Sequence, residues 1–580
     1  MVSTKTMLKK ISKKINIFLT FDQKLRISVL IFLHIVSSFL EIISIGVIPI
    51  LVLALIKPEK IILLAKNSIF ENFLSFIALQ DFILYGSYLI IFVFLFKNIF
   101  LSFLMYFEIS FFSSLRKSVS FRLFEKYIGQ DYLFHTHNNP SKLIRNISQE
   151  IDFAAGYIEG IMTIIKESLI VISIIILLLF INIWMTLAIT ISLASVVIVF
   201  YILLKERIRK KGLLSQTMRS EIIKLVNHTI GSIKDIKILQ KENYFTKIFQ
   251  GYFGKHEKLK IYKTMVSQLP QRILEFVIIV LIVSFIMFFK DSFSSIEEFI
   301  SVLTLFVISA IRLYPSFSRI NANLIVVKDL FVSFDLIRND LMLKENFSSE
   351  MVSHVPKFTK SIIFDNVYFN FGDKKILKGV SFEILKGQFV ALVGKSGSGK
   401  STIIDLIMGL LIANKGKIKI DEMGLDLEKF DYKKLFGYVP QDIYLLDDSI
   451  KRNIALGIDD KDIDHSRLND VINLSQLDKF IKKEGNDINS IVGNRGIKIS
   501  GGELQRIGIA RALYNNPEII ILDEATANLD HDTALSFLDS LNSIKKEKTI
   551  IFATHQPELI KKCDKVYYIK EGVVLEKDKI

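Results

Sequence analysis

Six long apolar segments, separated by short charged stretches, occupy the first 325 residues of the chain. A helix that crosses a lipid bilayer needs about 20 mostly apolar residues, and every segment reaches that length. The segments are 25–56, 82–112, 157–181, 183–205, 270–290 and 296–325. The pattern therefore predicts an α-helical membrane domain with six spans.

Basic residues indicate the orientation of these spans. Arg116, Lys117 and Arg122 follow the second segment, and a cluster from Lys205 to Lys211 follows the fourth. Because such clusters mark the cytoplasmic side, we expect both chain ends in the cytoplasm and external loops near 58–81, 182 and 291–295. The net charge of +15 fits this membrane topology, and we expect no nucleic-acid partner.

The character of the chain changes after about residue 353, where strand-like runs alternate with polar helices and glycine turns. This indicates an α/β domain. We place the membrane domain at 1–345, a linker at 346–358 and the α/β domain at 359–580. The single cysteine, Cys563, excludes a disulfide scaffold and a zinc site built from several cysteines.

The α/β domain contains a glycine-rich phosphate-binding motif. Residues 394–401 match the P-loop pattern G-x-x-x-x-G-K-[ST], after a strand predicted at 389–393 and before a helix predicted at 402–411. In such a loop, backbone N–H groups surround the phosphates of ATP, Lys400 contacts the outer phosphates and Ser401 ligates Mg²⁺. The residues assigned to this site are Gly394, Lys395, Ser396, Gly397, Ser398, Gly399, Lys400, Ser401 and Thr402.

A second motif carries the carboxylates that ATP hydrolysis requires. The apolar strand predicted at 519–522 ends in Asp523 and Glu524. We expect Asp523 to hold Mg²⁺ through water and Glu524 to act as the general base for the attacking water.

Between these two motifs, Ile499-Ser500-Gly501-Gly502-Glu503 resembles the signature sequence of ATP-binding-cassette (ABC) transporters, although Ile and Glu replace the usual Leu and Gln at its ends. Gln441 resembles the Q-loop glutamine that reaches Mg²⁺ and the lytic water. His555 resembles the switch histidine, and Ala527–Asp530 resembles the D-loop. The resemblance implies further nucleotide-binding residues, namely Phe371 as the adenine-stacking ring, Ser500, Gly501, Gly502, Glu503 and Asp530.

The resemblance also implies an architecture. Six spans followed by one P-loop cassette is the arrangement of an exporter-type (type IV) ABC half-transporter. In that family two cassettes sandwich two ATP molecules head to tail, so we expect a homodimer in the bacterial inner membrane. The segments His135–Lys142 and Ile230–Lys237 lie where the cytoplasmic coupling segments of exporters lie.

Three basic residues inside the predicted spans suggest a substrate site. Lys97, Arg272 and Arg312 lie about 22–27 Å from the external ends of their spans at 1.5 Å per residue. A belt of these cations suits a phosphate or pyrophosphate group. Alternatively, they reach toward the membrane surface or pair with carboxylates such as Glu108, Glu167 or Glu275.

Within the family the chain most resembles flippases of polyprenyl-pyrophosphate-linked oligosaccharides, through stretches such as 37–50, 269–273 and 312–316. An apolar pattern at 68–80 predicts an external interfacial helix, or else an ordinary packed loop helix. Two other functions stay open. One is export of another amphipathic cargo, such as lipid A, a drug or a peptide, and the other is a membrane ATPase that regulates a partner.

Overall fold

The computed structural model describes residues 14–56, 79–289, 296–344, 357–421, 423–424, 432–483, 487–493, 499–526, 531–545 and 547–577. The chain divides into two compact units. The first comprises Met1–Gln130 and Asn138–Glu345, and the second comprises Asp131–His137 and Asn346–Ile580. The predicted interfacial helix at 68–80 and the predicted linker at 346–358 lie mostly outside the described residues.

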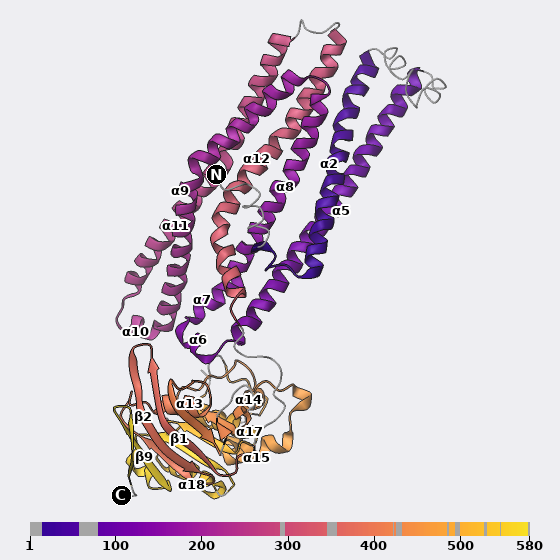
Figure 1. Cartoon of the computed structure of the whole chain (residues 1–580). Helices are drawn as coiled ribbons and strands as arrows, with labels where there is room; N and C mark the ends of the chain where they lie inside the picture. The colour runs from indigo at the N-terminus through magenta and orange to yellow at the C-terminus, as the bar shows by residue number, and fades with distance from the viewer. Residues whose placement is uncertain are drawn as a thin grey trace. The chain divides into compact units, whose positions relative to one another are not determined.

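Long helices dominate the first unit and run side by side (Figure 1). They are α2 (Phe21–Ile56), α5 (Leu79–Ile128), α8 (Ile151–Leu179), α9 (Ile183–Gly231), α11 (Glu242–Phe289) and α12 (Ile296–Leu341). The shorter elements of this unit are α7 (Pro140–Arg145), a π-helical turn at Asn146–Glu150 and α10 (Ile233–Ile238). Each long helix overlaps one of the six predicted spans, although α8 ends two residues before the predicted end at 181 and α11 ends one residue before the predicted end at 290. Most of the helices extend well beyond the predicted start or end.

Within the described residues, five helical segments are long and apolar enough to cross a membrane. They are Phe21–Leu53, Leu84–Ile128, Pro140–Leu179, Ile183–Leu204 and Glu242–Phe288. The same measure does not select α12, so the crossing of the bilayer by the sixth predicted span stays a prediction.

The core of the helical unit forms where α2, α8, α9, α11 and α12 meet. Its fully buried members include Ile174 of α8, Leu193 of α9, Leu274 of α11 and Leu313 of α12. Many outward-facing side chains are also apolar, and Phe92, Phe96 and Ile99 of α5 are each more than half exposed in the single chain. A helix that is apolar on its outer face as well as its inner face fits a lipid environment.

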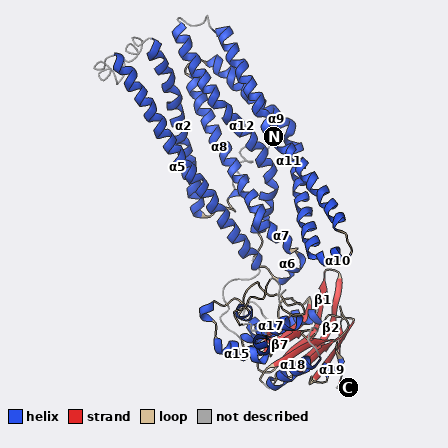
Figure 2. Ribbon diagram, turned by 180° about the vertical axis from the view of Figure 1, so that it is seen from behind, coloured by secondary structure: helices blue, strands red, loops and turns tan. Residues whose placement is uncertain are grey.

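The second unit contains two β-sheets flanked by helices (Figure 2). An antiparallel sheet has the order β2-β1-β4-β5, and a mostly parallel six-stranded sheet has the order β10-β9-β3-β8-β7-β6. The strands are β1 (Ser361–Phe371), β2 (Lys374–Leu385), β3 (Phe389–Val393), β4 (Lys415–Ile420), β5 (Met423–Gly424), β6 (Phe436–Val439), β7 (Ile519–Asp523), β8 (Thr549–Thr554), β9 (Lys565–Lys570) and β10 (Val573–Lys577).

Helices surround the parallel sheet, some in contact with it and others packed on neighbouring helices. They are α13 (Lys400–Ile407), α14 (Ile450–Ile454), α15 (His465–Leu474), α16 (Asp478–Lys483), α17 (Gly501–Tyr514), α18 (His531–Ile544) and α19 (Pro557–Ile560), with 3₁₀ turns at Tyr432–Leu435 and Asp460–Asp462. The central strands are buried on both faces, as expected for parallel strands between helical layers. The single cysteine, Cys563, is fully buried in this core.

The helix after the P-loop differs from its prediction at both ends. We predicted a helix at 402–411, whereas α13 runs from Lys400 to Ile407. It ends early because Gly409 adopts a left-handed conformation with φ of +65°, and the N–H groups of Leu410 and Leu411 both donate to the carbonyl of Asp405. Such an ending terminates a helix regardless of how apolar the following residues are.

A short helix from between the second and third predicted spans belongs to the second unit. Helix α6 (Tyr132–His137) begins after Asp131, whose carboxylate accepts a hydrogen bond from the Phe134 N–H at 2.9 Å. Leu133 packs against the apolar cluster that contains Leu406 and Ile407 of α13. The expected coupling segment at 135–142 thus begins within a helix that packs on the α/β core.

Candidate functional site

The order of the parallel strands brings the predicted catalytic residues to one edge of the sheet. Strands β3, β8, β7 and β6 are neighbours in that order and run in the same direction. The P-loop follows β3, His555 follows β8, Asp523 ends β7 and Gln441 follows β6. Because the carboxyl ends of parallel strands share an edge, motifs that are far apart in sequence meet there.

The P-loop is shaped for close approach to an anion. Gly397 and Gly399 have φ values of +77° and +110°, which side chains other than glycine rarely adopt. A Cβ atom at Gly394 would lie 2.5 Å from the carbonyl oxygen of Ile569. The loop leads directly into α13, whose first N–H groups have no acceptor within the helix. The loop therefore fits the phosphates of ATP.

Two polar groups of the loop support this fit. The Lys400 ammonium donates to the carbonyl oxygens of Gly394 at 2.8 Å and Lys395 at 3.3 Å, and its side chain is only 6% exposed. The Ser398 hydroxyl is buried and has no hydrogen-bond partner among the described residues. The Lys400 ammonium can supply positive charge to phosphate oxygens, and the Ser398 hydroxyl can donate a hydrogen bond to them.

Glu524 is the centre of the predicted catalytic group. One carboxylate oxygen accepts a hydrogen bond from the Gln441 amide at 2.9 Å. The other oxygen lies 3.8 Å from the Lys400 ammonium and 3.7 Å from Nδ1 of His555. Glu524 has a φ of +50°, and its N–H donates to the carbonyl of Ala553 on the neighbouring strand. The structure therefore brings together Glu524, Gln441, His555 and Lys400.

The predicted Mg²⁺ ligands Ser401 and Asp523 also meet. The side chains of Ser401 and Asp523 are hydrogen bonded to each other. Burial and the neighbouring Glu524 carboxylate raise the pKa of Asp523, although the bond with Ser401 and the Lys400 charge oppose this. A buried carboxylate beside a hydroxyl is a suitable donor set for Mg²⁺, whose charge would favour the ionised form.

Asp405 is a further acidic residue that our sequence analysis missed. Burial and the charge of Asp523 raise the pKa of Asp405 to about 6. The spacing in the sequence could have indicated this residue, because Asp405 lies four residues after Ser401 and therefore on the same face of α13.

The other residues predicted to bind the nucleotide lie on separate elements. Ser500 caps α17, since its hydroxyl accepts from the Glu503 N–H at 3.4 Å while the Glu503 carboxylate accepts from the Ser500 N–H at 2.7 Å. Gly501 and Gly502 form the first turn of this helix. The Phe371 ring, at the end of β1, is 37% exposed and lies edge-on to Phe369 at 4.9 Å. Asp530 lies outside the described residues.

Two of the three basic residues predicted for substrate meet at one carboxylate in the helical unit. The Glu41 carboxylate of α2 lies 3.0 Å from the Lys97 ammonium of α5 and also forms an ion pair with Arg312 of α12. Arg272 of α11 instead pairs with Glu275 of its own helix at 3.5 Å, and both side chains are more than half exposed. The three residues therefore do not form a single cluster within one chain.

The carboxylate partners differ partly from those considered in the sequence analysis. The sequence suggested that the basic residues could pair with Glu108, Glu167 or Glu275, and Glu275 does pair with Arg272. In contrast, Glu108 pairs with Lys166 at 3.1 Å, and Glu167 pairs with Arg319 at 2.6 Å. Glu41 was not considered at all. Sequence gives the depth of a residue along a helix, but not the direction in which neighbouring helices turn their faces.

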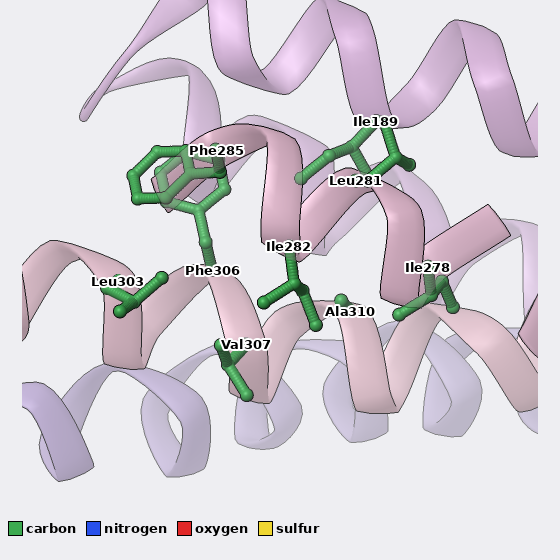
Figure 3. A pocket seen from close by; sticks show the side chains of 9 residues that line it. All are labelled: Ile189, Ile278, Leu281, Ile282, Phe285, Leu303, Phe306, Val307 and Ala310. Carbon is green, nitrogen blue, oxygen red and sulfur yellow. The ribbon is translucent and has the colours of Figure 1, made fainter. Parts of the chain in front are cut away.

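A small pocket between α9, α11 and α12 has no polar lining. Its nine side chains are Ile189, Ile278, Leu281, Ile282, Phe285, Leu303, Phe306, Val307 and Ala310 (Figure 3). Without a donor or a charge, it has no group that could recognise a phosphate.

Comparison with known families agrees with both units. A family model described as "ABC transporter transmembrane region" matches residues 27–314, and one described as "ABC transporter" matches residues 377–527. The two matches follow each other along most of the chain. The chain belongs to the ABC transporters.

Individual relatives place this ABC transporter among exporters. It is 28% identical over 455 residues to the "ATP-dependent lipid A-core flippase" of Francisella tularensis subsp. tularensis strain SCHU S4, covering 76% of this chain and 72% of the relative. It is 26% identical to the flippase of the same name from Escherichia coli K12, covering 79% and 78% of the two chains.

A solved structure supports the type IV exporter fold. The "Structure of a bacterial Atm1-family ABC exporter with ATP bound" matches with a TM-score of 0.75 and 18% identity, covering 95% of this chain and 94% of that chain. The predicted fold class, a helical membrane domain followed by an ABC nucleotide-binding domain, is confirmed.

Proposed function

We propose that this ABC exporter uses ATP hydrolysis to move a lipid with a phosphorylated head group across the bacterial inner membrane. The observation that carries the ATPase part is the meeting of Gln441, Lys400 and His555 around the Glu524 carboxylate. The lipid part is supported by relatives named lipid A-core flippases.

Each residue of the ATP site has a role that follows from its position. Bound ATP supplies the phosphoanhydride bond whose hydrolysis drives transport. Glu524 accepts the proton of the attacking water, and Gln441 orients the Glu524 carboxylate through their hydrogen bond. Lys400 turns from the loop carbonyls toward the outer phosphates, while Ser401 and Asp523 would hold Mg²⁺.

We propose that the transporter works as a homodimer. This chain contains one P-loop and one signature motif, which the family resemblance places on opposite sides of each ATP. Ser500 and Gly501 lie at the capped N-terminus of α17 and are exposed in the single chain. They are therefore accessible to a nucleotide held by a partner chain. Both termini and the nucleotide-binding unit are proposed to be cytoplasmic.

Two phosphorylated lipids are candidate cargo. The names of the relatives favour a lipid A-type cargo. The resemblance at 37–50, 269–273 and 312–316 favours a polyprenyl-pyrophosphate-linked oligosaccharide. Both carry an anionic head group on an apolar anchor, and the intramembrane cations Lys97, Arg272 and Arg312 suit that shared chemistry.

Reconstitution separates these candidates. The purified transporter is placed in proteoliposomes with fluorescent lipid A or fluorescent lipid-linked oligosaccharide, and protection of the label from an external quencher is followed with and without ATP. ATP-dependent movement of one lipid identifies the cargo class. ATP hydrolysis without movement of either lipid would refute the proposal and favour the regulatory ATPase.

A further inference from the structure

The ion cluster formed by Glu41, Lys97 and Arg312 has an unbalanced charge. It joins three helices, and the exposed fractions of the three side chains are 4%, 12% and 27%. Two cations share one carboxylate, so the cluster carries a net charge of +1 when all three groups are ionised. In contrast, the two pairs Glu108–Lys166 and Glu167–Arg319 contain one charge of each sign.

The contacts of Lys97 show how closely this cluster is held. Its ammonium donates to the Ser44 hydroxyl at 2.9 Å as well as pairing with Glu41 at 3.0 Å. The Ser44 hydroxyl donates in turn to the backbone carbonyl of Glu41 at 2.9 Å. Since Glu41 and Ser44 lie one turn apart on α2, this helix is tied to α5 through Lys97 and to α12 through Arg312.

Arg312 is the most accessible member of the cluster. Its Nε atom contacts Glu41, and no other acidic side chain contacts Arg312 in the part of the chain that the structure describes. A guanidinium presents five donors in a planar fork, so most of its hydrogen-bonding capacity remains available. An anion could therefore bind Arg312 first, at its exposed side.

We propose that Glu41 is an internal counter-ion that competes with the phosphate of the cargo lipid for Lys97 and Arg312. Without cargo, the carboxylate neutralises part of the charge in a low-dielectric environment, where unpaired cations are costly. With cargo, the more highly charged phosphate replaces the carboxylate on both cations. The exchange releases α2 from α5 and α12, so cargo binding loosens the helices that must move. This inference rests on the proposed function.

Competition predicts that removing the carboxylate charge tightens binding. Glu41→Gln keeps the shape of the side chain but leaves Lys97 and Arg312 without their anion. The full-length variant in detergent should melt at a lower temperature than the wild type, and undecaprenyl diphosphate should restore part of that loss. The concentration of undecaprenyl diphosphate that gives half of this effect should be about 10-fold lower for Glu41→Gln than for the wild type, a size typical of coupling between two sites.

Matched variants test whether this effect belongs to the cluster. Glu167→Gln also removes a buried span carboxylate paired with an arginine of α12, and it should leave lipid affinity within about 2-fold. Glu41→Gln combined with Arg312→Gln should lose the gain. Neutral undecaprenol should have no effect on any variant. If Glu41→Gln does not fold, the shorter Glu41→Asp should show a smaller change in the same direction.

Binding of two different lipids, together with the flipping assay, distinguishes failure of the Glu41 proposal from failure of the proposed function. Lipid A, tested beside undecaprenyl diphosphate, identifies which phosphorylated lipid competes with Glu41. If the wild type flips one of these lipids and Glu41→Gln binds it no more tightly, the role of Glu41 is refuted while the proposed function stands. If the wild type flips neither lipid, the proposed function itself fails.

Discussion

The Gln441 amide donates a 2.9 Å hydrogen bond to the Glu524 carboxylate across 83 residues of sequence. The two residues meet because they follow the adjacent parallel strands β6 and β7. One carboxylate oxygen is thereby fixed, and the other faces Lys400 and His555. In the role that we propose for Glu524 as the general base, this arrangement keeps one oxygen directed toward the P-loop lysine.

Replacing Glu524 by Gln should leave ATP binding intact and nearly abolish hydrolysis. The amide keeps the size of the side chain and its bond to Gln441, but it cannot accept a proton from water. Loss of a general base typically reduces the rate by about 10²–10⁴-fold. Phosphate release measures hydrolysis, and labelled ATP retained on the protein measures binding. Turnover near the wild-type rate would remove Glu524 from the mechanism.

Mixing two inactive variants tests the homodimer. Ser500→Arg replaces the cap of α17 with a bulky cation, and Lys400→Ala removes the phosphate-contacting charge. If each ATP site takes its P-loop from one chain and its signature from the other, a mixed dimer retains one intact site. Co-expression with two different tags and sequential purification should therefore recover ATPase activity. A fully active monomer by light scattering would contradict the sandwich.

Replacing both Arg272 and Arg312 by Ala should abolish flipping of the cargo lipid. Glu41 would retain Lys97, whereas Glu275 would stay exposed, so we expect little unfolding. The corresponding Lys variants keep the charge but lose bidentate contacts with phosphate, and they should be affected less than the Ala variants. Quencher protection in proteoliposomes measures flipping, and melting temperature controls for folding. Full flipping by the double Ala variant would eliminate these cations as a substrate site.

Asp421→Asn should lower stability at neutral pH. Burial alone would raise the pKa of Asp421, but hydrogen bonds from the N–H groups of Lys360, Thr359 and Ser361 and from the Thr359 hydroxyl outweigh it and hold the pKa below its ordinary value. Asparagine tolerates the φ of +57° at this position, so the change removes the charge and one accepting oxygen without straining the backbone. We expect a loss of about 1 kcal/mol, since the site is largely solvated.

The pH dependence of this effect follows from its sign. A carboxylate with a lowered pKa stabilises the folded state above its ordinary pKa of about 4, and the stabilisation disappears as pH falls through the lowered value. The difference in melting temperature between wild type and Asp421→Asn should therefore be largest at neutral pH and shrink as the pH falls below about 4, the ordinary pKa of the group. A difference that stays constant with pH would show that the charge is not responsible.

The arrangement of the candidate ATP site was largely predictable because its residues lie in short motifs of fixed pattern. Glu524 and Gln441 were assigned from short sequence patterns, and parallel strand order brings them together. Glu41 could not be assigned in this way. Its partners come from α5 and α12, and helical periodicity does not specify how three long helices turn toward one another. The early end of α13 was also missed, because a left-handed Gly409 overrides an apolar pattern.

The length of the long helices has a mechanical consequence. Helix α5 has 50 residues and α9 has 49, so each extends about 75 Å at 1.5 Å per residue, against a hydrocarbon layer of about 30 Å. Neither contains proline, whereas α11 contains Pro270 and α12 contains Pro315. We therefore expect α5 and α9 to tilt as rigid rods, so that a tilt at one end displaces the other end in proportion to the length of the helix. A proline interrupts the hydrogen bonding of a helix, so α11 and α12 can bend within three residues of Arg272 and Arg312. Bending there would reorient these two side chains directly.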